Sequence, residues 1–361
     1  MPFGAGGESP PVCFSPYRSL RERRDGLQYS GTQGVQPYCC AVRHTFFVLF
    51  RSGVAGLIVY RELSSLKRDL GVSAHELYAL SNNLPRHYRR AQIAKPDGGV
   101  RVLFIPDEAL KRVQRRIARR LLAHMPVSPH ATAYRYGAKT VYNAVPHAGK
   151  PMVLKLDIRH FFDSVRYSDV KQLAFPADIY AEPLRILLSM LCYYREGLPQ
   201  GAPSSPAISN LILRPFDDAV GNWCYARRIS YTRYCDDMTF SGEFALREVL
   251  AFVQPELNKR GFFLNPEKTQ CVRSGQRQMV TGLVVNEKPN IPAEYRRKLR
   301  QELYYCKKFG VEEHLARCGI DEGAETFLRR LLGRVNYVLQ IAPNDAQLRQ
   351  ARQWLRLQLR G

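Results

Sequence analysis

The middle of the chain contains a series of short apolar runs of the kind that form strands. Residues 152–156 are apolar and predict a buried strand. Residues 229–234 and 238–240 are rich in Ile, Tyr, Thr, Met and Phe, so they predict the two arms of a β-hairpin. Residues 90–95 and 100–105 predict a second hairpin, because the turn between them is Pro-Asp-Gly-Gly.

Helical spacing of apolar residues fills much of the rest of the chain. The predicted helices cover 61–70, 74–82, 107–122, 207–216 and 244–260, and 294–361 follows a helical pattern throughout. One more strand is predicted at 279–286. Near the C-terminus an apolar stripe follows a predicted N-cap at Asn344, and we interpret it as intramolecular packing: Leu348, Ala351, Leu355 and Leu359. Helices together with antiparallel strands predict an α+β fold.

Three acidic residues stand out against this pattern. Asp236 and Asp237 lie side by side where the hairpin arms meet, and Asp157 ends the buried strand 152–156. Adjacent like charges at a tight turn repel each other, so such a pair is usually accompanied by a cation. Carboxylate oxygens favour Mg²⁺. If the strand end meets the hairpin tip, the three acids are able to hold two Mg²⁺ ions about 4 Å apart, the geometry of phosphoryl transfer.

A second acidic pair provides an internal comparison. Asp217-Asp218 follows Arg214-Pro-Phe and predicts the solvated first turn of a helix, where acids suit the helix dipole. We therefore expect no metal there, and none at Asp163 or Asp169.

With the loop between them, the acidic segments resemble the palm motifs of reverse transcriptases, and in detail those of the bacterial retron type. The loop begins Leu198-Pro-Gln-Gly-Ala-Pro and runs to Ser209-Asn210. Two further segments are retron-like: Asn143-Ala144 followed by His147, and Val280-Thr281-Gly282. The resemblance covers roughly residues 61–345. One departure is Cys235, where these enzymes usually carry Ala; Cys is small enough to keep the turn intact.

The resemblance implies a right-hand polymerase with fingers, a palm made of an antiparallel sheet plus helices, and a helical thumb. The expected domains are an N-terminal extension, partly disordered, at 1–60, fingers at 61–150, the palm with the catalytic motifs at 151–289, and the thumb at 290–361.

The resemblance also implies RNA-directed DNA polymerase activity and assigns roles to single residues. Asp157, Asp236 and Asp237 would hold two Mg²⁺ ions, with the backbone carbonyl of Ile158 as a further ligand, and Lys268 would donate a proton to the leaving group. The expected nucleotide-binding residues are Lys95, Arg101, Phe162 and Gln200. Phe162 would exclude a ribose 2′-hydroxyl by steric clash, with Phe161 facing the core.

The implied partners are deoxynucleoside triphosphates, a structured non-coding RNA that serves as template and primer, its complementary DNA, and an effector protein. Synthesis from an internal guanosine 2′-hydroxyl would yield a branched RNA–DNA product (msDNA), and retrons of this type imply anti-phage defence. The expected RNA-binding residues are Asn143, His147, Thr281, Arg296, Arg297 and Lys298. His147 has an equal alternative as a hydrogen-bonded structural histidine.

Two alternatives remain open at the level of sequence. The first is a reverse transcriptase of the group II intron or diversity-generating type, although no maturase or nuclease segment follows the predicted thumb. The second is a polymerase-derived RNA-binding protein without catalysis, which the intact acidic residues disfavour. A nuclease or an aspartic protease explains neither the Leu-Pro-Gln-Gly loop nor the 90–105 hairpin.

The charge of the chain agrees with a polyanionic partner. Lys and Arg number 54 against 32 Asp and Glu, a formal net charge of +22. Residues 86–120 alone hold eleven basic and three acidic residues. In 107–122 the apolar positions Leu110, Val113, Ile117 and Leu121 leave the basic residues on other faces, where they are available to phosphates.

The nine cysteines form no Cys-x-x-Cys pair, so we expect reduced thiols in a cytoplasmic protein. Residues 45–60 are apolar but shorter than the about 20 residues of a membrane span, and they contain Arg51. A packed element is therefore favoured over a membrane anchor, and a start of the working protein near residue 60 is a further alternative.

Overall fold

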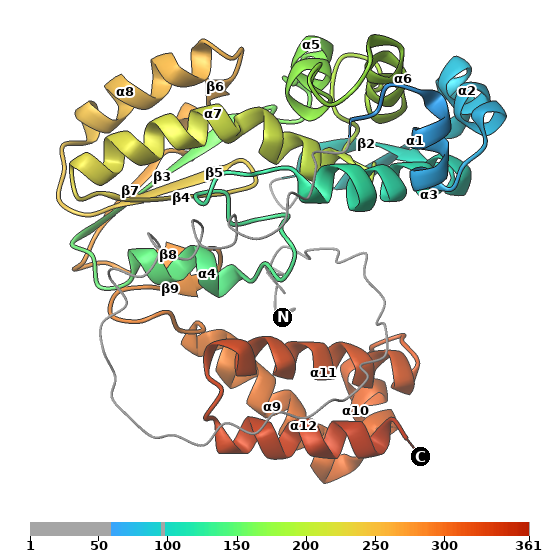
Figure 1. Ribbon diagram of the computed structural model, residues 1–361. Coiled ribbons are helices and arrows are strands. Elements are labelled where there is room, and N and C mark those ends of the chain that lie inside the picture. The colour runs from blue at the N-terminus through green and yellow to red at the C-terminus, as the bar shows by residue number, and fades with distance from the viewer. Residues whose placement is uncertain (1–58, 95–97, 361) are drawn as a thin grey trace, which may run out of the picture. The chain divides into compact units, whose positions relative to one another are not determined.

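The computed structural model describes residues 59–94 and 98–360. An antiparallel five-stranded sheet organises the region that carries the acidic residues (Figure 1). Its strands are β3 (Met152–Arg159), β4 (Ser230–Tyr234), β5 (Asp237–Ser241), β6 (Phe263–Leu264) and β7 (Gln270–Arg273). The order is β4-β5-β3-β6, and β7 also pairs with β3. The predicted strand 152–156 and the predicted hairpin at 229–240 are therefore confirmed as neighbours in one sheet.

The alternation of side chains along β3 gives the sheet two different faces. Leu154, Leu156 and Ile158 point into the larger hydrophobic core, together with Met238 and Phe240 of β5. Helices α7 (Ser205–Ala226) and α8 (Leu246–Asn258) cover this face (Figure 1). The residues between them, which include the acids, point to the opposite face.

The N-terminal described helices and the first hairpin match the prediction closely. They are α1 (Leu63–Leu70), α2 (Ala74–Asn82), β1 (Tyr88–Ala94), β2 (Val100–Pro106) and α3 (Glu108–Arg116), which continues as a π-helical turn to Leu121. Ser73 caps α2 by accepting from the Glu76 amide at 3.1 Å, and Asp107 caps α3 by accepting from Leu110 at 2.9 Å. The predicted apolar stripe of α3 is buried. Helices α5 (Tyr167–Asp169) and α6 (Glu182–Cys192) follow β3.

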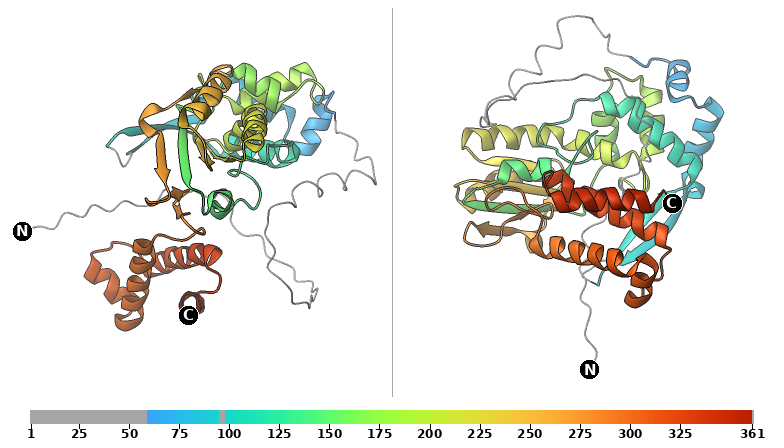
Figure 2. Two further views of the ribbon diagram at one scale, coloured as in Figure 1. Left: turned by 90° about the vertical axis from the view of Figure 1, so that its left-hand side faces the viewer. Right: turned by 90° about the horizontal axis from the view of Figure 1, so that it is seen from below.

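Four C-terminal helices share a second hydrophobic core and lie together in all views (Figures 1 and 2). They are α9 (Ala293–Phe309), α10 (Val311–Cys318), α11 (Ala324–Ile341) and α12 (Ala346–Gln358). The predicted stripe on α12 is buried at Leu348, Ala351 and Leu355. Its N-cap is Asp345 rather than Asn344, because the Asp345 carboxylate accepts from the Leu348 amide at 3.1 Å.

Two predicted elements differ from the structure. The strand expected at 279–286 is a hairpin of β8 (Met279–Val280) and β9 (Leu283–Val284), because Thr281 and Gly282 both adopt positive φ, 45° and 79°, and reverse the chain. The helix expected at 207–216 extends to Ala226, with Pro215 inside it. The hairpin β8–β9 and helix α4 (Thr140–Ala144) lie on the sheet face opposite α7 and α8 (Figure 1).

The predicted N-terminal extension lies outside the described residues, apart from Val59 and Tyr60. Tyr60 is buried, and its hydroxyl donates to Asp69 at 2.8 Å. The six described cysteines are free thiols, as expected. None of the helices described in the structure has the length and apolar character needed to cross a bilayer. The boundaries between fingers, palm and thumb stay predictions.

Candidate active site

The antiparallel register brings the three predicted acids to one end of the sheet. Asp157 on β3 stands directly opposite Asp237 on β5. Asp236 lies in the turn just before β5, and its carbonyl accepts from the Ile158 amide at 3.1 Å. Residues opposite each other in such a pair have Cβ atoms about 5 Å apart. The predicted meeting of the strand end with the hairpin tip is thus confirmed.

Burial and the repulsion between neighbouring carboxylates raise the pKa of Asp236 and of Asp237. Burial raises the pKa of Asp237 to about 6, and the charges of Asp236 and Asp157 add to the effect. Burial also raises the pKa of Asp236, with a further contribution from Asp157, while Lys268 and Arg101 act in the opposite direction. A cation at this position would therefore relieve both desolvation and mutual repulsion.

Lys268 supplies one such positive charge. Its ammonium group donates to the Asp157 carboxylate, with Nζ 3.0 Å from Oδ2, and Asn265 donates to the other oxygen at 3.3 Å. Burial acts to lower the pKa of Lys268, but the hydrogen bond to Asp157 and the three carboxylates together raise it. The side chain of Lys268 is 61% exposed, whereas that of Asp157 is 6% exposed, so the pair opens towards solvent on the lysine side.

The donor set fits a hard divalent ion, because it consists of carboxylate oxygens. Among residues 59–94 and 98–360, no three His, Cys, Asp or Glu side chains already surround a common metal position.

Arg233 supports the turn that carries Asp236 by donating a hydrogen bond to the backbone of that turn. Cys235 adopts a left-handed conformation with φ 61°, and its carbonyl accepts from Arg233 Nη1 at 2.8 Å. The side chains of Arg233 and Asp217 are both 0% exposed, and they form a double hydrogen bond at 2.6 and 2.9 Å. Arg233 thus connects helix α7 to the backbone of the acidic turn.

The interpretation of Asp217 as a solvated residue in a first helical turn is wrong. Asp217 lies in the middle of α7, where it also accepts from the Tyr231 hydroxyl at 2.8 Å. A signal was present in the sequence, because Asp217 falls four residues after Leu213 and three before Val220 on the apolar side of the helix. Its neighbour Asp218 is half-exposed and lies 3.6 Å from Arg214.

Comparisons with known proteins agree with this geometry. A family model described as reverse transcriptase (RNA-dependent DNA polymerase) matches residues 93–295. The retron Mx65 reverse transcriptase of Myxococcus xanthus is 34% identical over 317 residues, 81% of this chain and 71% of that protein. The retron Ec86 reverse transcriptase of Escherichia coli is 30% identical over 273 residues, 74% of this chain and 85% of that protein. A solved telomerase from Candida albicans is similar over 74% of this chain and 66% of its own, with 11% identity and a TM-score of 0.42.

The chain belongs to the retron reverse transcriptases. It is therefore an RNA-directed DNA polymerase, and enzymes of this family depend on divalent metal ions. The match covers both acidic segments and the Leu-Pro-Gln-Gly loop between them.

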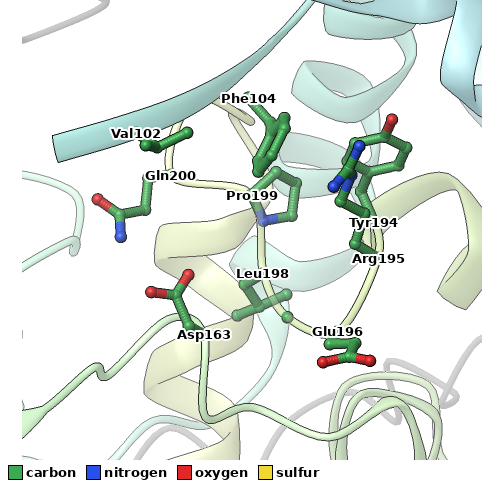
Figure 3. Close-up of a pocket in the computed structure, with 10 residues that line it drawn as sticks. Val102, Phe104, Asp163, Tyr194, Arg195, Glu196, Leu198, Pro199 and Gln200 are labelled. Carbon is green, nitrogen blue, oxygen red and sulfur yellow. The ribbon is translucent and has the colours of Figure 1, made fainter. Parts of the chain in front are cut away.

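In this reverse transcriptase, two of the predicted nucleotide-binding residues lie at β2: Arg101 belongs to the strand, and Gln200 shares a cavity with Val102 and Phe104. Gln200 lines a cavity of about 750 Å³. Figure 3 shows Gln200 and Val102 on one side of this cavity and Tyr194 with Arg195 on the other. Arg101 is exposed on β2, near enough for its charge to lower the pKa of Asp236. Lys95 lies outside the described residues.

Phe161 and Phe162 differ in burial, and both contact the larger hydrophobic core. Phe161 is buried and packs against Phe262 with ring centroids 5.7 Å apart, whereas Phe162 is only partly buried. At Gly201 the Leu-Pro-Gln-Gly loop passes close to the backbone of β2. A Cβ at Gly201 would lie 2.7 Å from the carbonyl oxygen of Phe104, so only glycine fits this contact.

Two of the predicted RNA-binding side chains, those of His147 and Asn143, are buried. The ring of His147 is 0% exposed and lies 2.6 Å from the Ser241 hydroxyl and 2.8 Å from that of Thr232. Burial, aided by the charge of Lys150, lowers the pKa of His147 to about 3, so the ring is neutral. His147 is a structural histidine that joins two strands of the sheet.

Asn143 is 1% exposed and accepts from the Thr132 hydroxyl at 2.7 Å, so it is not available on the outer surface either. Arg296 is engaged within the protein, since its guanidinium pairs with Asp345 at 3.0 Å. Arg297 and Lys298 are exposed on α9. The remaining predicted RNA-binding residue, Thr281, donates to the carbonyl of Thr140 at 3.2 Å and stays partly exposed.

Proposed function

We propose that this retron-type reverse transcriptase copies a structured non-coding RNA of its own, from the 2′-hydroxyl of an internal guanosine, into a branched RNA–DNA product. The observation that supports the chemistry is the register of Asp157 against Asp237, with Asp236 in the adjoining turn. The similarity to named retron enzymes supports the choice of RNA. The exposed Arg297 and Lys298 provide phosphate-binding charge.

In the proposed mechanism, Asp157, Asp236 and Asp237 would hold two Mg²⁺ ions, and the carbonyl of Ile158 would add a ligand. When bound, these ions supply activation of the attacking hydroxyl and neutralisation of the triphosphate. Lys268, already hydrogen-bonded to Asp157, donates a proton to the leaving pyrophosphate.

The chain's other residues bind and select the nucleotide. Lys95 and Arg101 grip the triphosphate from the β1–β2 hairpin. Phe162 lies beneath the incoming sugar and rejects a 2′-hydroxyl by contact, and Gln200 borders the same pocket. Because the clash is with the sugar, this selection does not depend on which base the nucleotide carries.

The proposed setting is cytoplasmic anti-phage defence, in which the branched product works with an effector protein. Support for this setting comes only from the similarity to retron enzymes. The upstream DNA of the gene should encode a short structured RNA with inverted repeats.

The decisive experiment is purification of the protein with its upstream RNA, followed by treatment of the nucleic acid with a debranching enzyme. We expect DNA joined to RNA through a 2′ linkage, absent when Asp236→Asn replaces the wild type. DNA that is never 2′-linked would overturn the retron product and favour a reverse transcriptase of the intron or diversity-generating type.

A further inference from the structure

Asn143 and His147 lie four residues apart in one short helical segment, formed by α4 and the 3₁₀ turn Val145–His147. Residues at this spacing share one face of such a segment. That face is buried, whereas Tyr142 and Val145 on the remaining surface of the segment are exposed. The segment lies on the sheet face opposite α7 and α8 (Figure 1). Two buried polar side chains at this place need hydrogen-bond partners, and the β4–β5 hairpin supplies them.

His147 joins the two strands of this hairpin. Its Nε2 lies 2.8 Å from the hydroxyl of Thr232 on β4, and its Nδ1 lies 2.6 Å from the hydroxyl of Ser241 on β5. A neutral imidazole has one N–H donor and one acceptor nitrogen, and a hydroxyl serves as either partner, so both contacts are satisfied at once. Ser241 is four residues from Asp237 on β5, so the two side chains point to the same face of the sheet.

Asn143 reaches the hairpin through Thr132. The Asn143 oxygen accepts from the Thr132 hydroxyl at 2.7 Å, and that hydroxyl also lies 3.0 Å from the carbonyl oxygen of Arg233 on β4. The Thr132 amide donates to the same carbonyl at 2.8 Å, and the Arg233 amide donates to the carbonyl of His130 at 2.8 Å. Residues 130–132 therefore pair with the edge of β4, and Asn143 fixes the side chain that completes this pairing.

Arg233 links this pairing to the acids. It lies three residues before Asp236, and its guanidinium donates to the carbonyl of Cys235 at 2.8 Å. Strand β4 pairs with β5 as far as Asp237, which stands opposite Asp157. A displacement of the β4 edge would therefore move Asp236 and Asp237 relative to Asp157. A misplacement of about 1 Å in an active site can slow a reaction about 10²-fold.

We infer that Asn143 and His147 are positioning residues for DNA synthesis, which hold the β4–β5 hairpin so that its acidic turn stays in place beside Asp157. They act through Thr132, Thr232 and the strands, and not through contact with RNA. The inference rests on the proposed function, because it takes the three acids to be the metal ligands.

The test uses two measurements on the full chain. The first is the affinity for Mn²⁺ without nucleic acid, followed by electron paramagnetic resonance of the free ion. The second is the single-turnover rate of nucleotide addition on a primed RNA template, with template and triphosphates saturating. The variants are Thr132→Val, which has nearly the same shape but no hydroxyl, Thr132→Ser, which keeps the hydroxyl, Asn143→Ala, and the double variant with Thr132→Val. Val145→Ala, on the exposed face of the same segment, is the matched control.

We expect Thr132→Val and Asn143→Ala each to lower the rate about tenfold and to raise the Mn²⁺ dissociation constant by a similar factor, with unchanged affinity for the primed template. Because both act through one contact, the double variant should lose about tenfold and not about a hundredfold. Thr132→Ser and Val145→Ala should behave as wild type. His147→Phe, which fills the same space without the two hydrogen bonds, should lower the rate and the Mn²⁺ affinity as well.

A loss of thermal stability with rate and Mn²⁺ affinity unchanged would overturn the inference, because it would make both residues purely structural. Weaker template binding with a wild-type rate at saturation would also overturn it, and would make them RNA contacts. Additive losses in the double variant would show that Asn143 does not act through Thr132. If Mn²⁺ binding survived Asp236→Asn, the proposed metal ligands would be wrong, and the rates of the Thr132 and Asn143 variants would still decide the positioning role.

Discussion

Arg233 and Asp217 form a doubly hydrogen-bonded ion pair that solvent does not reach. Arg233 at the same time donates to the carbonyl of Cys235, the residue whose left-handed backbone turns the chain into Asp236. Two residues that bind no substrate thereby link helix α7 to the acidic turn. Such a pair is costly to break, because either partner alone is an uncompensated buried charge.

The first prediction follows from this pair. Asp217→Asn should lower the free energy of unfolding by about 3–5 kcal/mol, since it leaves the Arg233 charge without compensation. Asp218→Asn is the matched control and should change stability by less than about 0.5 kcal/mol, because its partner Arg214 is half-exposed. Urea unfolding measures both. Equal midpoints for the two variants would contradict the structural role of the pair.

The second prediction concerns pH and metal. The pKa of Asp237 is raised from 3.8 to about 6, so below pH 6 a metal ion must displace a proton from it. The metal concentration for half-maximal DNA synthesis should therefore be about fourfold higher at pH 5.5 than at pH 7.5. If the metal concentration for half-maximal DNA synthesis were the same at both pH values, the pKa of Asp237 would not be raised.

The same shift has a consequence for the metal-free protein. Because the folded pKa lies above the unfolded value, Asp237 contributes most stability below about pH 4, and this contribution is lost as the pH rises through about 6. Added divalent metal should restore stability above pH 6. Thermal unfolding with and without metal across this range checks the sign.

The third prediction separates two adjacent aromatic residues. Phe162→Ala should raise ribonucleotide incorporation by about tenfold or more, because it removes the contact that excludes a 2′-hydroxyl. Phe161→Ala should instead lower stability by about 3–5 kcal/mol, because its ring is buried against Phe262. If only Phe161→Ala relaxed sugar selection, Phe161 and not Phe162 would be the residue that faces the nucleotide pocket.

The fourth prediction concerns Lys268. Lys268→Met should reduce the single-turnover rate of nucleotide addition by about 10²–10⁴-fold, the usual contribution of a positioned proton donor, and should remove the high-pH limb of the rate profile. Lys259→Met removes an exposed lysine of the same type and should leave rate and profile unchanged. A rate loss that is uniform in pH would assign Lys268 to charge neutralisation only.

The sequence by itself determined the local elements and the acids that they carry. Turn chemistry at Pro96–Gly99 and the β-prone residues on both sides of Asp236 are short-range signals, and the structure has hairpins at both places. The motif order also sufficed to indicate the family, since the spacing of Asp157, the Leu-Pro-Gln-Gly loop and Asp236 is written directly in the chain.

Only the tertiary structure decided which polar residues are buried together. Asp217 and Arg233 are 16 residues apart, so no local pattern pairs them. Side chains of β3 alternate between the two faces of the sheet, so Lys155 and Asp157 share one face and Leu154 and Leu156 share the other. The packing of the sheet determines which of these faces is covered by the core. His147 became structural for the same reason: the hydroxyls that satisfy it come from β4 and β5, 85 and 94 residues further along the chain.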